Sequence, residues 1–297
     1  MNEDIFYHTP VMVEEVLEWL KVGDGKIFLD GTLGGGGHAF QILKRASVDA
    51  RLIGIDKDAN AIDHANERLK EFSGRFDLKQ IPFSRAMSLK DEPGILGFDG
   101  ILLDLGISSA QVDLPHRGFS FGKKGPLDMR MGPFGDSLIE KLSDADVVSL
   151  SDVIEKYGEE RRAKKIASLI IKAHDEGRLT DTLSLAEVVA GAFAHKGGKI
   201  NVATKTFQAL RIWVNDEIEE LKKFLSFAPT LLLPQGRLVI ISYHSLEDRL
   251  VKRSFKGWTE DERFFLPHKK VVMPKLEEIR RNKRARSAKL RILEREA

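Results

Sequence analysis

The chain has 297 residues, of which 42% are hydrophobic, so it can form one large α/β domain or a domain with an insertion. It contains no cysteine, which excludes disulfides, thiolate zinc sites and cysteine nucleophiles. The net charge is only +2, but seven lysines and arginines and no acid lie between Arg280 and Arg291. This cluster indicates either a polyanionic partner or a solvated tail.

Nothing in the sequence suggests a membrane segment. The longest apolar runs, such as Leu231–Leu233 and Leu238–Ile241, are far too short to cross a bilayer. The first four residues, Met1–Asp4, are polar and acidic and do not resemble a signal peptide. We therefore expect a soluble, cytoplasmic protein.

The first hundred residues alternate between predicted strands and helices. Strands are expected at Ile27–Leu29, Leu52–Ile55, Leu78–Ile81 and Gly100–Leu103, with helices at 38–46, 59–72 and 86–90 between them. This alternation is typical of a parallel sheet covered by helices, in which ligands bind at the carboxyl ends of the strands. Asp30, Asp56 and Asp104 all fall at such ends.

The pattern changes in the middle of the chain. Residues 115–135 are rich in Gly, Pro and Phe and indicate a loop, while 144–195 has helical spacing of apolar residues. Ser184 and Glu187 have the spacing of a capping box at the start of a helix. We predict an all-helical insertion at 114–205 within a discontinuous sheet domain formed by 1–113 and 206–297.

The sheet domain is expected to resume with a long helix. Its apolar face runs from Phe207 to Leu225 and should dock on the sheet. A strand at Arg237–Ser242, a helix at Leu246–Phe255 and a last strand at Leu290–Leu293 follow.

Four consecutive glycines, Gly34, Gly35, Gly36 and Gly37, connect the first strand to its helix. Without Cβ atoms, such a loop lets backbone N–H groups approach a ligand closely. Asp56, at the end of the second strand, is placed to accept hydrogen bonds from ribose hydroxyls. Together these features predict a cofactor that contains adenosine.

Asp30, just before the glycines, distinguishes between two such cofactors. A carboxylate there would repel the pyrophosphate of a nicotinamide dinucleotide but suits the cationic methionine end of S-adenosylmethionine. The pattern favours the methyl donor, and a nicotinamide oxidoreductase is the weakest alternative. We expect no metal.

The chain also resembles a specific family, the RsmH/MraW family of small-subunit ribosomal RNA methyltransferases, along nearly its whole length. The segments that carry the resemblance are His8–Val11, Asp30–His38, Asp104–Ser109, Leu127–Met131, Tyr157–Arg161, Thr206–Arg211, Ser242–Arg249 and Arg286–Arg291. The resemblance implies a Rossmann-like class I methyltransferase sheet and methylation of the exocyclic N4 of one cytidine in the decoding region of 16S ribosomal RNA, with the small subunit as partner.

The resemblance also implies roles for individual residues. His38 and Gln111 would contact the donor, Phe83 would lie on its adenine side, and Asp104 would face the sulfonium. Ser108 and Asp113 lie on the loop that should border the reacting methyl group, where they either touch the target base or stabilise the turn, and with Asp104 they are the catalytic candidates. The group that accepts the N4 proton is not identified, and for His244 a structural hydrogen bond is as plausible as a role in the site.

The chain departs from other methyltransferases in two places. Thr32 replaces the glycine that most of them carry two residues after the loop acid, and no Asn/Asp-Pro-Pro-aromatic signature for gripping an amine follows Asp104. A mechanism cannot therefore be borrowed from those enzymes.

Two further functions stay open. A small-molecule methyltransferase would leave the insertion and the basic segment without a role, and an RNA-binding assembly factor with a vestigial donor site would not need three intact strand-end acids. The basic run Arg161–Lys165 is either a solvated helix face or a phosphate contact.

Overall fold

The computed structural model describes residues 10–193 and 202–297. The chain forms two compact units, the first from Met1–Gly106 and Ile218–Ala297 and the second from Ile107–Glu217.

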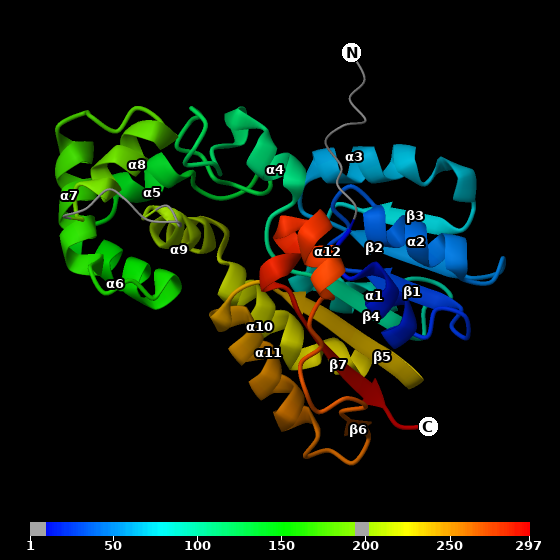
Figure 1. Cartoon of the computed structure of the whole chain (residues 1–297). Coiled ribbons are helices and arrows are strands. Elements are labelled where there is room, and N and C mark those ends of the chain that lie inside the picture. Colours follow the sequence, from blue (N-terminus) through cyan, green and yellow to red (C-terminus); the bar gives the residue numbers. More distant parts are fainter. Residues whose placement is uncertain (1–9, 194–201) are drawn as a thin grey trace. The chain divides into compact units, whose positions relative to one another are not determined.

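The first unit is built on a seven-stranded sheet with the order β3-β2-β1-β4-β5-β7-β6 (Figure 1). Strands β1 to β5 are parallel, whereas β7 runs antiparallel to both β5 and β6. The strands are β1 (Ile27–Asp30), β2 (Arg51–Ile55), β3 (Phe76–Lys79), β4 (Phe98–Asp104), β5 (Leu232–Ser242), β6 (Phe264–Phe265) and β7 (Lys289–Arg295). The prediction that the strand ending on Asp104 is followed in the sheet by the one containing Arg237–Ser242 is confirmed.

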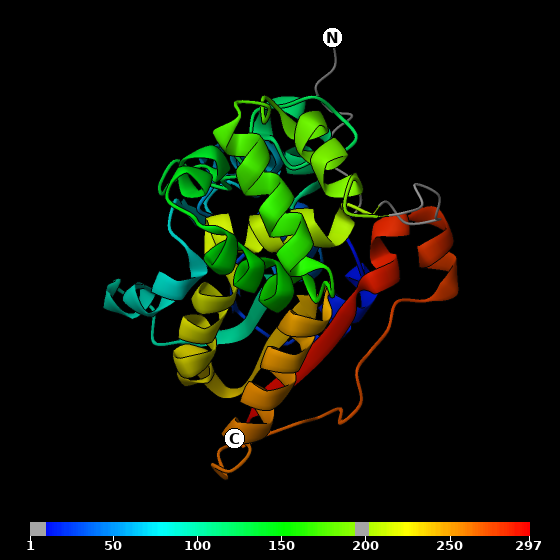
Figure 2. The ribbon, with the colours of Figure 1, turned by 90° about the vertical axis from the view of Figure 1, so that its left-hand side faces the viewer.

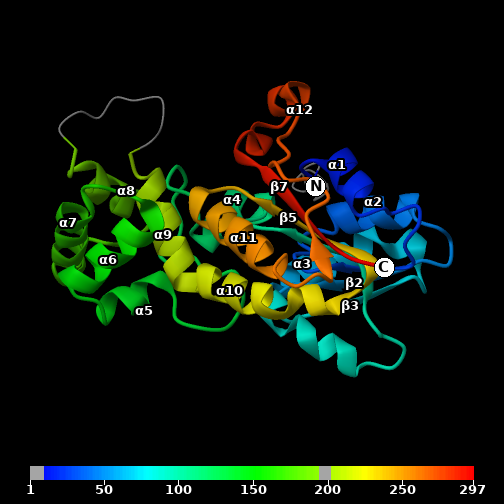
Figure 3. The same ribbon diagram turned by 90° about the horizontal axis from the view of Figure 1, so that it is seen from below.

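Both faces of this sheet are buried. Alternate residues point to opposite faces, so Phe28 and Leu102 belong to one apolar cluster while Leu29 and Leu103 belong to the other. Figure 3 shows α1 and α2 on one side of the sheet and α10 and α11 on the other. The elements of this unit outside the sheet are α1 (Val13–Trp19), α2 (Gly37–Arg45), α3 (Ala59–Arg68), η2 (Lys70–Phe72), η3 (Phe83–Asp91), α10 (Glu217–Phe227), η5 (Ala228–Leu231), α11 (Ser245–Trp258), α12 (Leu276–Arg281) and η6 (Lys283–Ser287).

The second unit is helical and has its own apolar core (Figure 2, green). Its elements are α4 (Ser109–Asp113), η4 (Pro115–Arg117), α5 (Leu138–Ser143), α6 (Val147–Gly158), α7 (Ala163–Asp175), α8 (Thr182–Ala190) and α9 (Thr204–Asn215), and its described residues include no strand. The predicted capping box was placed one turn too late. Asp181 caps α8 and Ser184 completes the box, because the Asp181 carboxylate accepts hydrogen bonds from the Leu183 and Ser184 amides.

The predicted long helix over 207–225 is in fact two helices. Asp216 lies between α9 and α10 with a left-handed φ of 49°, and α9 contributes Phe207 and Leu210 to the core of the second unit. Only α10 docks on the sheet, through Leu221 and neighbouring residues. The compact units therefore divide after residues 106 and 217, whereas the sequence placed the insertion at 114–205.

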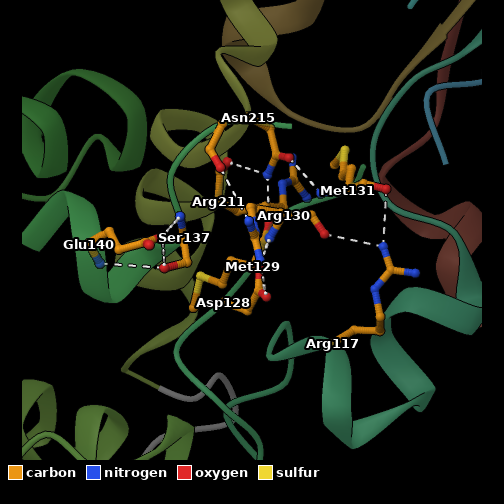
Figure 4. Close-up of polar contacts among 10 residues, drawn as sticks. Arg117, Asp128, Met129, Arg130, Met131, Ser137, Glu140, Arg211 and Asn215 are labelled. Carbon is orange, nitrogen blue, oxygen red and sulfur yellow. Dashed lines mark hydrogen bonds and ion pairs between the residues drawn. The ribbon is translucent and has the colours of Figure 1, made fainter. Parts of the chain in front are cut away.

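The segment Leu127–Met131, expected to lie in a loop, is held in place by polar contacts within the second unit (Figure 4). The Asn215 side-chain oxygen accepts a hydrogen bond from the Met131 amide at 2.7 Å, and its amide nitrogen donates to the Met129 carbonyl at 2.8 Å. Arg117 donates to the Met131 carbonyl at 3.0 Å. Met129 is fully buried with a φ of 60°. These contacts fasten Leu127–Met131 to α9 and η4.

Candidate functional site

Three carboxylates gather at the carboxyl edge of the sheet in the first unit. Asp30 is the last residue of β1, Asp104 is the last residue of β4, and Asp56 directly follows β2. Because β2, β1 and β4 are neighbours and parallel, their carboxyl ends meet at one edge. The position of all three acids at strand ends is as predicted from the sequence.

Asp30 lies deepest, with 1% of its surface exposed. Its Oδ1 accepts a hydrogen bond from the Thr32 amide at 3.2 Å, but its Oδ2 is buried and has no hydrogen-bond partner in the described part of the chain. Burial raises the pKa of Asp30 from 3.8 to about 7, against the lowering effect of His38 and with a smaller rise from Asp104 and Asp56. An unpartnered buried acceptor of this kind fits a ligand with a cationic hydrogen-bond donor.

Three residues lie against Asp104. Its Oδ1 accepts a hydrogen bond from the Tyr243 hydroxyl at 2.7 Å, and its Oδ2 lies 3.5 Å from His38 Nε2. Its amide donates to the Thr32 hydroxyl at 2.6 Å, which gives the threonine at this unusual position a clear structural role. Burial, together with the Asp104 charge, raises the pKa of Tyr243 well above 10, so the hydroxyl keeps its proton and donates it.

Tyr243 is a site residue that was not predicted from the sequence. It follows β5, and β5 pairs in parallel with β4 so that Ile241 lies opposite Asp104. A residue just beyond the end of β5 therefore reaches the carboxylate at the end of β4. The available signal was its position just past a strand end, but the neighbouring strand could not be identified without the sheet order.

The glycine loop has the conformation that glycine makes possible. Gly34 and Gly36 have φ angles of 49° and 72°, and Gly36 caps the amino end of α2. A Cβ on Gly36 would also lie 3.1 Å from the Cβ of Ala65. Gly35 lies between these two turns, and Gly37 and His38 begin α2, in which His38 is buried.

Asp56 connects the loop to the second strand. Its Oδ2 accepts a hydrogen bond from the Gly34 amide and its Oδ1 accepts one from the Asp58 amide, both at 2.9 Å. Burial raises the pKa of Asp56, although these two hydrogen bonds counteract the rise. Each carboxylate oxygen has a further lone pair, so the group can still accept hydrogen bonds from a diol.

Phe83 begins η3 and packs edge-to-face on Phe224, with 5.6 Å between the ring centroids. This contact places part of the ring against the core of the sheet domain. Its predicted role beside an adenine stays a prediction.

Ser108, Gln111 and Asp113 belong to the second unit and have partners there. The Ser108 amide donates to the Gln111 side chain at 3.0 Å, and the Gln111 amide donates to the Ser108 hydroxyl at 3.2 Å, so the two cap the start of α4. Lys123 donates to the Asp113 carbonyl at 2.8 Å. Their expected roles at the donor and at the reacting methyl group stay predictions.

His244 caps α11, and its Nε2 lies 3.1 Å from Glu247 Oε1. This contact favours the structural interpretation of His244.

The basic segment near the carboxyl terminus contains two kinds of cation. Lys289 and Arg291 pair with Asp248 at 3.3 and 2.7 Å and so fasten β7 to α11. Lys283 and Arg286 are exposed and form no ion pair with a described residue. Only the second kind is available to a partner.

Among residues 10–193 and 202–297, no three His, Cys, Asp or Glu side chains lie close enough together to hold a metal ion. None of the helices described has the length and apolar character needed to span a membrane.

The chain matches the model of the MraW methylase family over residues 5–296. A relative named ribosomal RNA small subunit methyltransferase H, from Maridesulfovibrio salexigens, is 44% identical, and the match covers 97% of this chain and 95% of the relative. A relative of the same name from Prochlorococcus marinus subsp. pastoris is 45% identical, with 98% and 97% covered. The solved structure of an rRNA methylase from Streptococcus thermophilus aligns over 96% of this chain and 94% of that one at 14% identity, but its TM-score of 0.40 supports no conclusion.

Proposed function

Since the chain belongs to the MraW methylase family, we propose that it is a cytoplasmic enzyme that methylates the exocyclic N4 of one cytidine in the decoding region of 16S ribosomal RNA, with S-adenosylmethionine as donor. The name of its relatives supports ribosomal RNA of the small subunit as the substrate. The observation that carries the choice of donor is the buried, unpartnered Oδ2 of Asp30 beside the glycine loop.

The residues at the sheet edge fit this donor. Asp30 would accept a hydrogen bond from the ammonium group, Asp56 would accept from the ribose hydroxyls, and the glycine amides would approach the methionine end. Phe83 and Gln111 are the proposed further contacts. A nicotinamide dinucleotide fits poorly, because its pyrophosphate would meet the three strand-end carboxylates. S-adenosylmethionine, when bound, supplies a methyl group on an electrophilic sulfonium.

The protein contributes mainly by positioning. The lone pair of the cytosine N4 is delocalised into the ring, so the amine is a weak nucleophile and alignment must lower the barrier. Asp104 is the best-placed charged acceptor, because Tyr243 and Thr32 fix its carboxylate and backbone. Such a pre-oriented acceptor stabilises positive charge that develops near it. Ser108 and Asp113 are the proposed groups beside the target base, which must be unstacked from the RNA.

An RNA-binding assembly factor with a vestigial donor site is the main alternative. It would not require the Tyr243 hydroxyl to donate to Asp104 at the donor edge. A small-molecule methyltransferase would leave the exposed cations of both units without a partner.

Labelled S-adenosylmethionine and small ribosomal subunits provide the direct test. We expect label in N4-methylcytidine at one position and none with the Asp104→Ala variant. Label in another nucleoside would refute the proposed target. Binding of the donor without any transfer would favour the assembly factor, and binding of NAD instead of the donor would refute the proposed chemistry.

A further inference from the structure

A hollow in the second unit is lined mainly by cations. Its volume is about 490 Å³, and it lies at the start of α7. The lining residues are Arg161, Arg162, Lys164, Lys165, Ser168 and Leu169. Arg161 and Arg162 form the turn before α7, and Lys164 and Lys165 lie in its first turn, so four positive charges fall within five consecutive residues.

These cations lack a carboxylate partner in the described part of the unit. None of the four forms an ion pair with a carboxylate among the described residues, and Arg161 and Lys164 are exposed. The nearest acid in the sequence, Glu160, accepts a hydrogen bond from the Arg162 amide at 3.0 Å and so caps the turn. By contrast, two other cations of this unit, Lys172 and Arg178, both pair with Glu176. The lining of the hollow therefore contains four cations and no acid.

Two of the four cations, and the turn that precedes them, contact neighbouring segments of the unit. The Arg162 guanidinium stacks 4.5 Å from the centre of the Phe193 ring, and Lys165 donates to the Ala192 carbonyl at 3.1 Å. The turn before α7 is fixed by Lys205, which donates to the Glu159 carbonyl at 2.9 Å. A guanidinium stacked on a ring loses less conformational freedom when it binds an anion.

We propose that this hollow binds backbone phosphates of the RNA substrate. Four cations with a single hydroxyl, that of Ser168, match a repeated anion and offer little to a base edge, so the contact would position the RNA without reading its sequence. This inference rests on the proposed function, because it takes the substrate of that reaction as its ligand.

The test compares two double variants with the same change in charge. Arg161→Gln/Lys164→Gln removes two unpaired cations of the hollow, and Lys172→Gln/Arg178→Gln removes two cations already paired with Glu176. Affinity for small ribosomal subunits is measured from 50 to 300 mM salt. Each phosphate contact adds roughly 0.7 to the slope of log affinity against log salt, which is roughly 0.7 log units of affinity at 0.1 M salt relative to 1 M. We therefore expect the first variant to bind about 25-fold more weakly at 0.1 M salt and to lose about 1.4 from the slope. The control should change little.

Three further measurements make the result decisive. Affinity for S-adenosylmethionine should be unchanged in both variants, which shows that the first unit is intact. The charge-conserving variant Arg161→Lys/Lys164→Arg should restore the salt slope. An unchanged slope in the first variant, or an equal loss in the control, would overturn the phosphate site while wild-type methyl transfer still upheld the proposed function. Absence of methyl transfer by the wild-type protein would instead refute the function itself.

Discussion

Replacing Tyr243 with phenylalanine should slow methyl transfer strongly without unfolding the protein. The change removes only the hydroxyl that donates to Asp104 Oδ1 at 2.7 Å. It keeps the ring, which packs on the apolar cluster that contains Phe28 and Leu102. A hydrogen bond to a charged group contributes about 1.5–3 kcal/mol, which corresponds to a loss of about 10- to 150-fold. The assay is single-turnover methyl transfer to small ribosomal subunits at saturating donor.

Two comparisons show whether the effect passes through Asp104. Tyr157→Phe removes a hydroxyl that makes no hydrogen bond to any described residue, so its rate should stay within about twofold of wild type. In an Asp104→Asn background the Tyr243 change should add little, because residues in one hydrogen-bonded pair are not independent. Full additivity, or equal losses in the Tyr157 and Tyr243 variants, would refute a positioning role for Tyr243.

The remaining predictions concern pH, the donor and the basic segment. Because the pKa of Asp30 in the folded protein is about 7, binding of the cationic donor at pH 6 should release protons, and the affinity for the donor should rise with pH up to about 7. Calorimetry should show neither effect for the Asp30→Asn variant. The folded protein binds the Asp30 proton more tightly than the unfolded chain does, so the free energy of unfolding of the ligand-free protein, relative to that of Asp30→Asn, should fall by about 4 kcal/mol as pH rises from about 4 to 7. Denaturant unfolding at several pH values would measure this change. Asp56→Ala should weaken donor binding by about 1.5–3 kcal/mol in calorimetry, and an unchanged affinity would exclude Asp56 as the ribose ligand. Lys283→Gln/Arg286→Gln should reduce RNA affinity and its salt slope in a salt titration, whereas Lys289→Gln should mainly lower the melting temperature, because Lys289 pairs with Asp248.

The sequence alone determined the features that depend on local pattern. The alternation of short apolar runs with helical spacing identified a parallel sheet, because strand and helix periods are properties of neighbouring residues. The glycines at 34–37 and the acids Asp30, Asp56 and Asp104 were placed correctly because a strand end is also a local feature. Motif order along the chain was enough to indicate the family.

Tertiary structure alone decided which distant residues meet. Tyr243 contacts Asp104, 139 positions away in the chain, because β5 pairs with β4. Lys289 and Arg291 form ion pairs with Asp248 because β7 lies beside α11, so these two cations of the basic segment are not available to a partner. The end of α9 at Asp216 could not be predicted from the sequence either. The apolar residues keep their helical spacing across this position, although the left-handed conformation of Asp216 ends the helix. Periodicity reports which face of an element is apolar, but the core against which that face packs depends on contacts between residues far apart in the chain.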